Sequence, residues 1–230
     1  MKLLIEFGAD VTACDNESLL SASRRGYVKI VQLLINSDAD IHAVNNKAIR
    51  CASGYGHIDV VKLLIANGAD VTAYDNESLI LASRKGYVKI VQLLINSGAN
   101  IHAEDNQAIR YASRYGYIDV VKLLIANGAN IHARDNLAIR EASQYGYINV
   151  VKLLIANGAD VTACDNESLI LASREGYVKI VQLLINSGAN IHAEDNQAIR
   201  NASRFGSDDP TCRISRKPKK FHFFWTYFDS

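Results

Sequence analysis

The chain has 230 residues, with 25 Lys or Arg against 24 Asp or Glu, so its formal net charge is +1. A nearly neutral chain lacks the clustered positive field that phosphate binding needs, which argues against nucleic acid as its ligand. No apolar run approaches the ~18 residues of a membrane-spanning helix, so we expect no transmembrane segment.

The four cysteines, Cys14, Cys51, Cys164 and Cys212, are scattered and include no Cys-x-x-Cys pair. This spacing argues against a disulfide framework and favours a reducing compartment, so we expect a cytoplasmic protein.

Glycine recurs along the chain at a period of 30 residues. One series precedes Ala and then Asp or Asn, and it comprises Gly68, Gly98, Gly128, Gly158 and Gly188. The other lies three residues after an Ala-Ser pair, and it comprises Gly26, Gly56, Gly86, Gly116, Gly146, Gly176 and Gly206. A fixed period of this length predicts a solenoid, an architecture that offers long surfaces to other macromolecules.

The first element is a half unit at residues 1–10, which matches the second half of the repeat. Because Met1 to Ile5 is already in register, we interpret it as repeat and not as a signal peptide.

Six full units follow over residues 11–190, and residues 101–130 represent them. Ile101 to Ala103 is predicted to be short and extended, and Asp105-Asn106 to form a turn. Asn106 is the expected N-cap of a first helix that runs through residues 108–114. The small Ala112 lets a neighbouring helix approach, and Gly116 is expected to end the helix in the left-handed conformation.

A second helix is predicted after Gly116, because Ile118, Val121, Leu124 and Ile125 form one apolar stripe that Val120 and Leu123 widen. Gly128 ends it. Isolated helices of ~12–15 residues are already marginal in water, so stacking between units must supply the stability.

The run from Gly116-Tyr117 through Leu123-Leu124-Ile125 to Gly128-Ala129-Asn130, repeated along residues 1–206, resembles the ankyrin repeat. The resemblance implies an all-α, ankyrin-type α-solenoid of 30-residue helix-turn-helix units with short β-hairpin loops. It also implies a monomeric scaffold or adaptor that binds a partner protein. Ankyrin units usually have 33 residues and begin helix one with Thr-Pro-Leu-His, whereas this chain has Glu77 to Ile80 or Gln107 to Arg110 there.

The shortened hairpin, the Asp-Asn turn and Ile-His-Ala together resemble the ankyrin-repeat proteins of giant, mimivirus-like DNA viruses. This narrower resemblance implies host proteins as partners and the host cytoplasm as the location.

Two unit types are present. One begins Val-Thr-Ala at residues 11, 71 and 161, and the other begins Ile-His-Ala at 41, 101, 131 and 191. Units 71–100 and 161–190 are identical at 28 of 30 positions and differ only at Tyr74/Cys164 and Lys85/Glu175. Most positions therefore serve the stack, and information specific to a partner must lie where units differ.

By resemblance, the hairpin tips and the variable helix-one position face a concave groove. The candidate partner-binding residues are Tyr74, Glu104, Arg110, Tyr111, Arg114, Tyr115, Arg134, Arg140, Glu141 and Tyr145. Five of them are expected to cluster in the adjacent units of residues 101–160: Tyr111, Arg114, Tyr115, Glu141 and Tyr145. Tyr and Arg are typical interface anchors, although a solvated surface is an equal alternative. The periodic arginines, Arg50, Arg110, Arg140 and Arg200, either cover apolar stems in place of the missing His or form a partial basic stripe.

No motif for catalysis or phosphate binding is present, so we expect neither enzymatic activity nor a cofactor. The repeated histidines, His42, His102, His132 and His192, suggest a metal only superficially. Stacked helices lie ~8–10 Å apart, whereas zinc needs ligands at ~2 Å. We expect these histidines to bond to the neighbouring backbone.

Another half unit covers residues 191–206, and residues 207–230 break the pattern. This tail contains both prolines, the only Trp and four of the six Phe, with five Lys or Arg against three Asp. Three interpretations remain open: an arbitrary tail on a fragment, a cover for the last helix, or a basic-aromatic segment that touches a membrane or a partner. The functional alternatives to an adaptor are accordingly a non-functional product of repeat duplication and tail-mediated peripheral membrane association.

Overall fold

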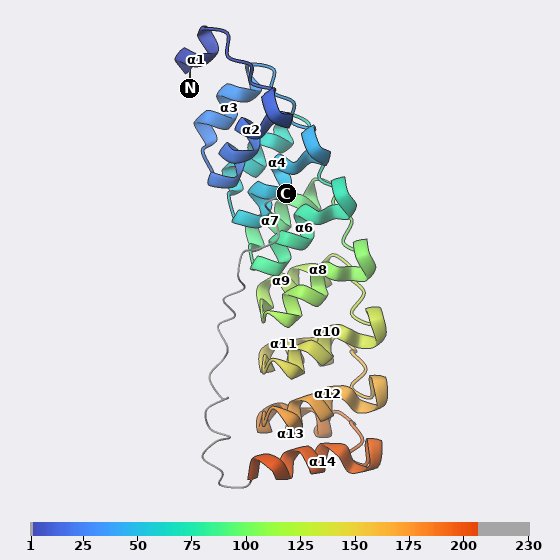
Figure 1. The fold of residues 1–230 in the computed structure, drawn as a ribbon. Coiled ribbons are helices and arrows are strands. Elements are labelled where there is room, and N and C mark those ends of the chain that lie inside the picture. Colours follow the sequence, from blue (N-terminus) through green and yellow to red (C-terminus); the bar gives the residue numbers. More distant parts are fainter. Residues whose placement is uncertain (1, 207–230) are drawn as a thin grey trace.

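A computed structural model describes residues 2–206 of the chain. Helices in these residues pair into units that stack into one elongated, gently bent array (Figure 1). The three interpretations of the tail concern residues 207–230 and lie outside the described residues.

The first helices of the units form one layer and pack in sequence against each other. They are α2 (Ala13–Arg25), α4 (Ala43–Tyr55), α6 (Ala73–Lys85), α8 (Ala103–Arg114), α10 (Ala133–Gln144), α12 (Ala163–Arg174) and α14 (Ala193–Gly206).

The second helices form the other layer, beginning with α1 (Lys2–Glu6). The others are α3 (Val28–Ile35), α5 (Ile58–Ala66), α7 (Val88–Asn96), α9 (Ile118–Ala126), α11 (Ile148–Ala156) and α13 (Val178–Asn186). The all-α solenoid expected from the repeat is thus confirmed.

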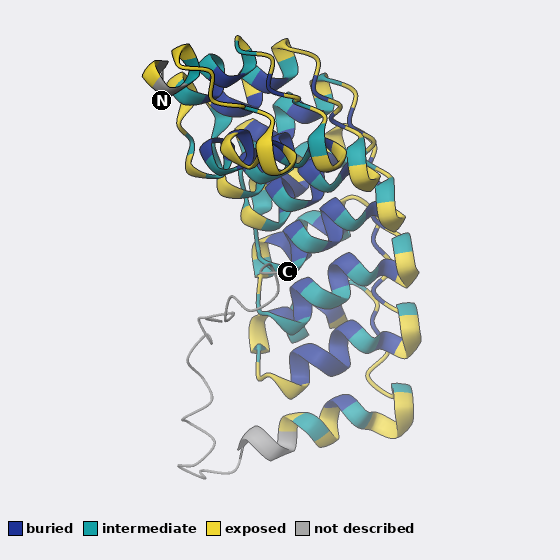
Figure 2. Cartoon of the chain, turned by 45° about the horizontal axis from the view of Figure 1, so that its top comes forward, coloured by how far each residue is buried: buried dark blue, intermediate teal, exposed yellow. Residues whose placement is uncertain are grey.

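The core lies between the two layers, where Figure 2 shows continuous buried segments. In the example unit Ile109 and Ala112 of α8 are fully buried, as are Val120, Val121 and Leu124 of α9. The remaining members of the predicted stripe, Ile118, Leu123 and Ile125, are partly buried against this core. The apolar period of the second helix therefore predicted the buried face correctly.

The connections between units are not β-hairpins, because no residue of 2–206 lies in a strand. Ile101 to Ala103 is not extended either: His102 has φ −90° and ψ −2°. Glu104, Asp105 and Asn106 follow with φ of 50°, 54° and 59°, which is one left-handed turn. Each such residue other than Gly costs ~1–2 kcal/mol, and Asp and Asn tolerate the conformation best. The recurring Asp-Asn pair therefore encodes this turn and not a hairpin.

Asn106 does not cap the helix through its side chain. Its Oδ1 atom instead accepts a hydrogen bond of 2.7 Å from the backbone N–H of Asn130, just before the next turn. The equivalent bonds of 2.6–2.9 Å are made by Asn16, Asn46, Asn76, Asn136 and Asn166. These six asparagines are only 5–7 % exposed. One side chain thus fixes each turn to the segment that enters the next unit.

The histidines belong to the same network. His102 places Nδ1 at 3.1 Å from Asn106 Oδ1, so the ring contacts a side chain of its own unit and not the neighbouring backbone as expected. His42, His132 and His192 have the same contact at 2.7–3.1 Å.

A second contact between units joins a glycine to an aromatic ring. Gly116 has φ +75°, and a Cβ atom built on it would lie 2.3 Å from the ring of Tyr147 in the next unit. The same close approach occurs between His57 and Gly26, Tyr87 and Gly56, Tyr117 and Gly86, and Tyr177 and Gly146. Glycine is needed here for the left-handed helix end and for the ring.

We predict that Asn136→Ala lowers the free energy of unfolding by about 1–3 kcal/mol, because it leaves the N–H of Asp160 without its partner. The matched control is Asp135→Asn, which keeps the left-handed turn and reproduces the residue found at Asn45. Urea unfolding measures both variants. Equal losses would show that the loss in Asn136→Ala is not specific to its hydrogen bond with Asp160.

We also predict that Gly116→Ala is more destabilising than Gly128→Ala. Both glycines have positive φ, but a Cβ at Gly128 meets nothing within 4 Å. Left-handed strain of ~1–2 kcal/mol is therefore common to both variants. Overpacking against Tyr147 adds ~1–3 kcal/mol at Gly116 alone. Chemical unfolding of both variants tests this, and indistinguishable midpoints would contradict the ring contact.

Candidate interaction surface

The candidate residues come from the first helices and from the left-handed turns that precede them. The periodic arginines mostly serve the turns. Arg110 donates from Nη2 to the carbonyl of Glu104 at 2.9 Å. Equivalent bonds run from Arg50 to Val44 O at 3.4 Å, from Arg140 to Arg134 O at 3.3 Å and from Arg200 to Glu194 O at 3.0 Å. This geometry supports a structural role over a basic stripe.

Two of these arginines also reach the next unit. Arg50 Nε lies 2.6 Å from Glu77 Oε2, and Arg140 forms an ion pair with Glu167. In the unit after Arg110, Leu137 occupies the position that Glu77 and Glu167 occupy in the units after Arg50 and Arg140. Arg110 is 8 % exposed, and burial lowers the pKa of its guanidinium. Arg110 therefore offers a partner little surface.

The residues predicted to cluster over α8 and α10 do come together. Arg114 Nη1 lies 3.3 Å from Glu141 Oε1, and the Arg114 guanidinium lies 5.4 Å from the centre of the Tyr145 ring. The rings of Tyr111 and Tyr115 have centroids 6.4 Å apart. The cluster is a set of mutually supported, partly buried side chains on the helix surface.

Within this cluster Glu141 is the electrostatically strained member. Its side chain is 16 % exposed, and Oε2 is buried without a hydrogen-bond partner among residues 2–206. Burial raises the pKa of this carboxyl group, and the attraction of Arg114 only partly opposes that effect.

The remaining candidates lie on the turns and are exposed. Tyr74 is 61 % exposed, and the Arg50 guanidinium lies over its ring at 4.5 Å. Arg134 donates from Nε and Nη2 to Asp105 Oδ2, both at 3.1 Å. The side chain of Glu104 has no ion pair among the described residues. Along the chain, these turn positions present an aromatic, an acidic and a basic side chain.

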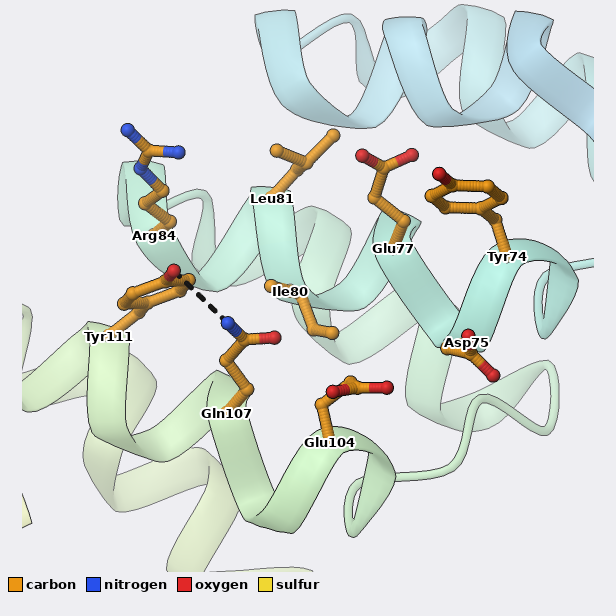
Figure 3. A pocket seen from close by; sticks show the side chains of 9 residues that line it. All are labelled: Tyr74, Asp75, Glu77, Ile80, Leu81, Arg84, Glu104, Gln107 and Tyr111. Atoms are coloured by element: carbon orange, nitrogen blue, oxygen red, sulfur yellow. Dashed lines mark hydrogen bonds between the residues drawn. The ribbon is translucent and has the colours of Figure 1, made fainter. Parts of the chain in front are cut away.

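A pocket of 260 Å³ opens between α6 and α8, and Figure 3 shows its lining. The residues around it are Tyr74, Asp75, Glu77, Ile80, Leu81, Arg84, Glu104, Gln107 and Tyr111. Gln107 donates from Nε2 to the Tyr111 hydroxyl at 3.0 Å, and the Arg84 guanidinium lies 5.7 Å from the Tyr111 ring centre.

Sequence reasoning selected Tyr74, Glu104 and Tyr111 but missed the pocket that they share. The available signal was Ile80, which stands where other units carry arginine.

Across residues 2–206, no helix combines the length and apolar character needed to cross a bilayer. In the same residues, no three His, Cys, Asp or Glu side chains form a group that could hold a metal ion. Cys14, Cys51 and Cys164 have free thiols.

Comparison with known proteins identifies this architecture. The family model for ankyrin repeats (3 copies) matches residues 1–75, 49–135 and 109–195. No curated protein sequence matches the chain. Among solved structures, the crystal structure of the human ASB11 ankyrin repeat domain is similar in fold, with a TM-score of 0.69 and 24 % sequence identity. That match covers 79 % of this chain and 96 % of the ASB11 domain.

Glu141 makes the stability of the fold depend on pH in a defined direction. Because its pKa is raised above the ordinary value of 4.5, the folded chain retains a proton that the unfolded chain has lost. Its contribution to the free energy of unfolding is therefore complete below pH 4.5 and is lost as the pH rises through the folded-state pKa. We predict that wild type loses stability relative to Glu141→Gln over that interval.

The measurement is urea unfolding of both proteins from pH 4 upward, expressed as the difference between them. Carboxyl groups such as Asp70, whose pKa is lowered by its hydrogen bonds to Thr72, titrate alike in both proteins and cancel. A difference that stays constant with pH would show that Glu141 has an ordinary pKa.

Proposed function

Because the chain belongs to the ankyrin repeat family, we propose that it binds a partner protein along its first helices and left-handed turns, without catalysing a reaction. Ankyrin repeats are protein-interaction modules. Most positions of the units serve the packing of the stack, so few positions remain for another function.

The observation that carries the proposal is where the units vary. Units 71–100 and 161–190 differ at only two positions, and one of these is the exposed turn residue Tyr74. The equivalent turn position holds Glu104 and Arg134 in the following units. Between units 71–100 and 161–190 the buried framework is therefore constant, and both differences lie on exposed side chains.

The side chains of Tyr74 and Arg134 are also held in place before any partner arrives. The Arg50 guanidinium supports the Tyr74 ring, and Asp105 orients Arg134 through two hydrogen bonds. Ordered side chains lose less conformational entropy on binding, so modest contacts give useful affinity. Tyr and Arg are moreover the residues most enriched among interface anchors.

The source of the partner follows from the sequence resemblance to the ankyrin proteins of giant DNA viruses. On that basis we propose that the chain acts on host proteins. The free thiols of Cys14, Cys51 and Cys164 favour the reducing host cytoplasm as its location.

The test is capture of a partner from a eukaryotic lysate by the immobilised full-length chain. We predict that Tyr74→Ala combined with Arg134→Ala reduces recovery of the captured protein about tenfold, with little change in Tm. The exposed Arg134–Asp105 pair contributes only ~0–1 kcal/mol to folding.

The matched control replaces Lys62 and Lys122 with Ala, because both are exposed residues of second helices. This control should retain the partner at the wild-type level. Equal loss in both double variants, or no protein retained by a folded wild-type chain, would contradict the proposal and favour a non-functional duplication product.

A further inference from the structure

The position of the periodic arginine carries a basic side chain in one type of unit and an apolar side chain in the other. Ile-His-Ala units carry an arginine there, whereas the Val-Thr-Ala units carry Leu20, Ile80 and Ile170. The chain therefore contains both filled and unfilled versions of one local geometry, and the filled version shows what the geometry binds.

The junction between α4 and α6 is a filled version. The Arg50 guanidinium contacts the carbonyl of Asn45 at 3.1 Å, the carboxylate of Glu77 at 2.6 Å and the Tyr74 ring at 4.5 Å. A turn carbonyl, a carboxylate and an aromatic face thus surround one planar cation. This combination matches the preferences of a guanidinium group, which donates in a fixed fork and stacks on rings.

The junction between α6 and α8 is one of the unfilled versions. Ile80 is too short to reach the turn as arginine does, and the pocket of 260 Å³ lies at this place. The pocket retains the same kinds of groups, because Glu104 supplies a carboxylate and Tyr74 and Tyr111 supply rings (Figure 3).

The charge of this pocket is unbalanced in favour of a cation. Asp75, Glu77 and Glu104 line it against the single base Arg84, which lies towards Tyr111. Arg50 already pairs with Glu77. Among residues 2–206, no side chain forms a hydrogen bond or ion pair with the carboxylate of Asp75 or Glu104. Two carboxylates are therefore available to an incoming group.

We propose that this pocket binds an arginine side chain of the partner protein, placed as the chain's own arginines are placed at neighbouring junctions. The inference rests on the proposed function and specifies its partner: a segment that presents an arginine to the groove. The aliphatic part of that arginine packs over Ile80 and Leu81, and its guanidinium lies between Glu104 and the turn of α6.

The first experiment needs no natural partner. N-acetyl-arginine amide is titrated into the full chain with labelled Leu methyl groups, and Leu81 in the pocket reports binding. Leu171 is the internal reference, because its unit has Cys164 instead of Tyr74 and faces Asn201 instead of Tyr111. We expect saturable shifts at Leu81, with N-acetyl-lysine amide binding about tenfold more weakly because ammonium lacks the planar fork.

Two variants test the template directly. Ile80→Arg supplies the missing guanidinium from the chain itself, and we expect it to weaken probe binding at least tenfold. Its Tm should not fall, since arginine is native at the equivalent positions 50 and 140. Glu104→Gln, which removes the free carboxylate, should weaken binding about tenfold. Ile170→Arg is the matched control and should leave the Leu81 titration unchanged.

Absence of saturable shifts at Leu81 would overturn the inference, as would equal binding of both probes or unchanged binding to Ile80→Arg. The captured partner separates this inference from the proposed function. A partner retained at the wild-type level by Ile80→Arg would refute the arginine pocket and leave groove binding standing. Loss of the partner only in Ile80→Arg, with Ile170→Arg unaffected, would support it.

Discussion

Each junction of this stack depends on one buried amide oxygen. The Oδ1 atom of Asn106 accepts the N–H of Asn130, and five equivalent bonds repeat this along the array. These hydrogen bonds are partly buried, and a backbone N–H that loses such a partner costs at most ~1–3 kcal/mol, so the asparagine stabilises each point at which the chain enters the next unit. The left-handed turn places the Asn106 side chain where it can accept this hydrogen bond. In the Ile-His-Ala units the histidine also contacts the same oxygen atom. The outward positions of Tyr74, Glu104 and Arg134 follow from that turn.

Neighbouring residues of the same turn therefore serve the stack and the binding surface. Asn106 faces inward and fixes the junction, whereas Glu104, two residues earlier on the same turn, faces outward and is free to vary. The strain of three consecutive left-handed residues is offset by contacts within the stack. An exposed side chain thus acquires a fixed position without contributing to the core.

The sequence predicted the helices, their order and the buried stripe, because period and apolar spacing determine which face of a short helix is covered. It also indicated that Tyr111, Arg114, Tyr115, Glu141 and Tyr145 gather over adjacent units. It predicted a turn at Asp105-Asn106 but not its left-handed conformation, because Asp-Asn is equally suited to a hairpin and to a left-handed turn, and only the position of Asn130 in space distinguishes them. The burial of Arg110 and the pocket beside Ile80 were missed for a related reason, because both depend on the residue in the next unit. The sequence period characterises a single unit, whereas residues of two adjacent units line the pocket.

The alternation of the two unit types has a consequence for the valency of the surface. An unfilled junction arises where a Val-Thr-Ala unit precedes an Ile-His-Ala unit, and it forms an arginine-sized pocket where rings such as those of Tyr74 and Tyr111 also line it, as at residues 71–130. Because the junctions within residues 11–190 are closed by the same asparagine and glycine contacts, duplicating that pair of units adds another junction of the same kind without disturbing the stack. The order of unit types along the chain would then set how many arginine-sized pockets the molecule offers and at what spacing. A partner with repeated arginines would then bind only in registers that match the spacing of these pockets.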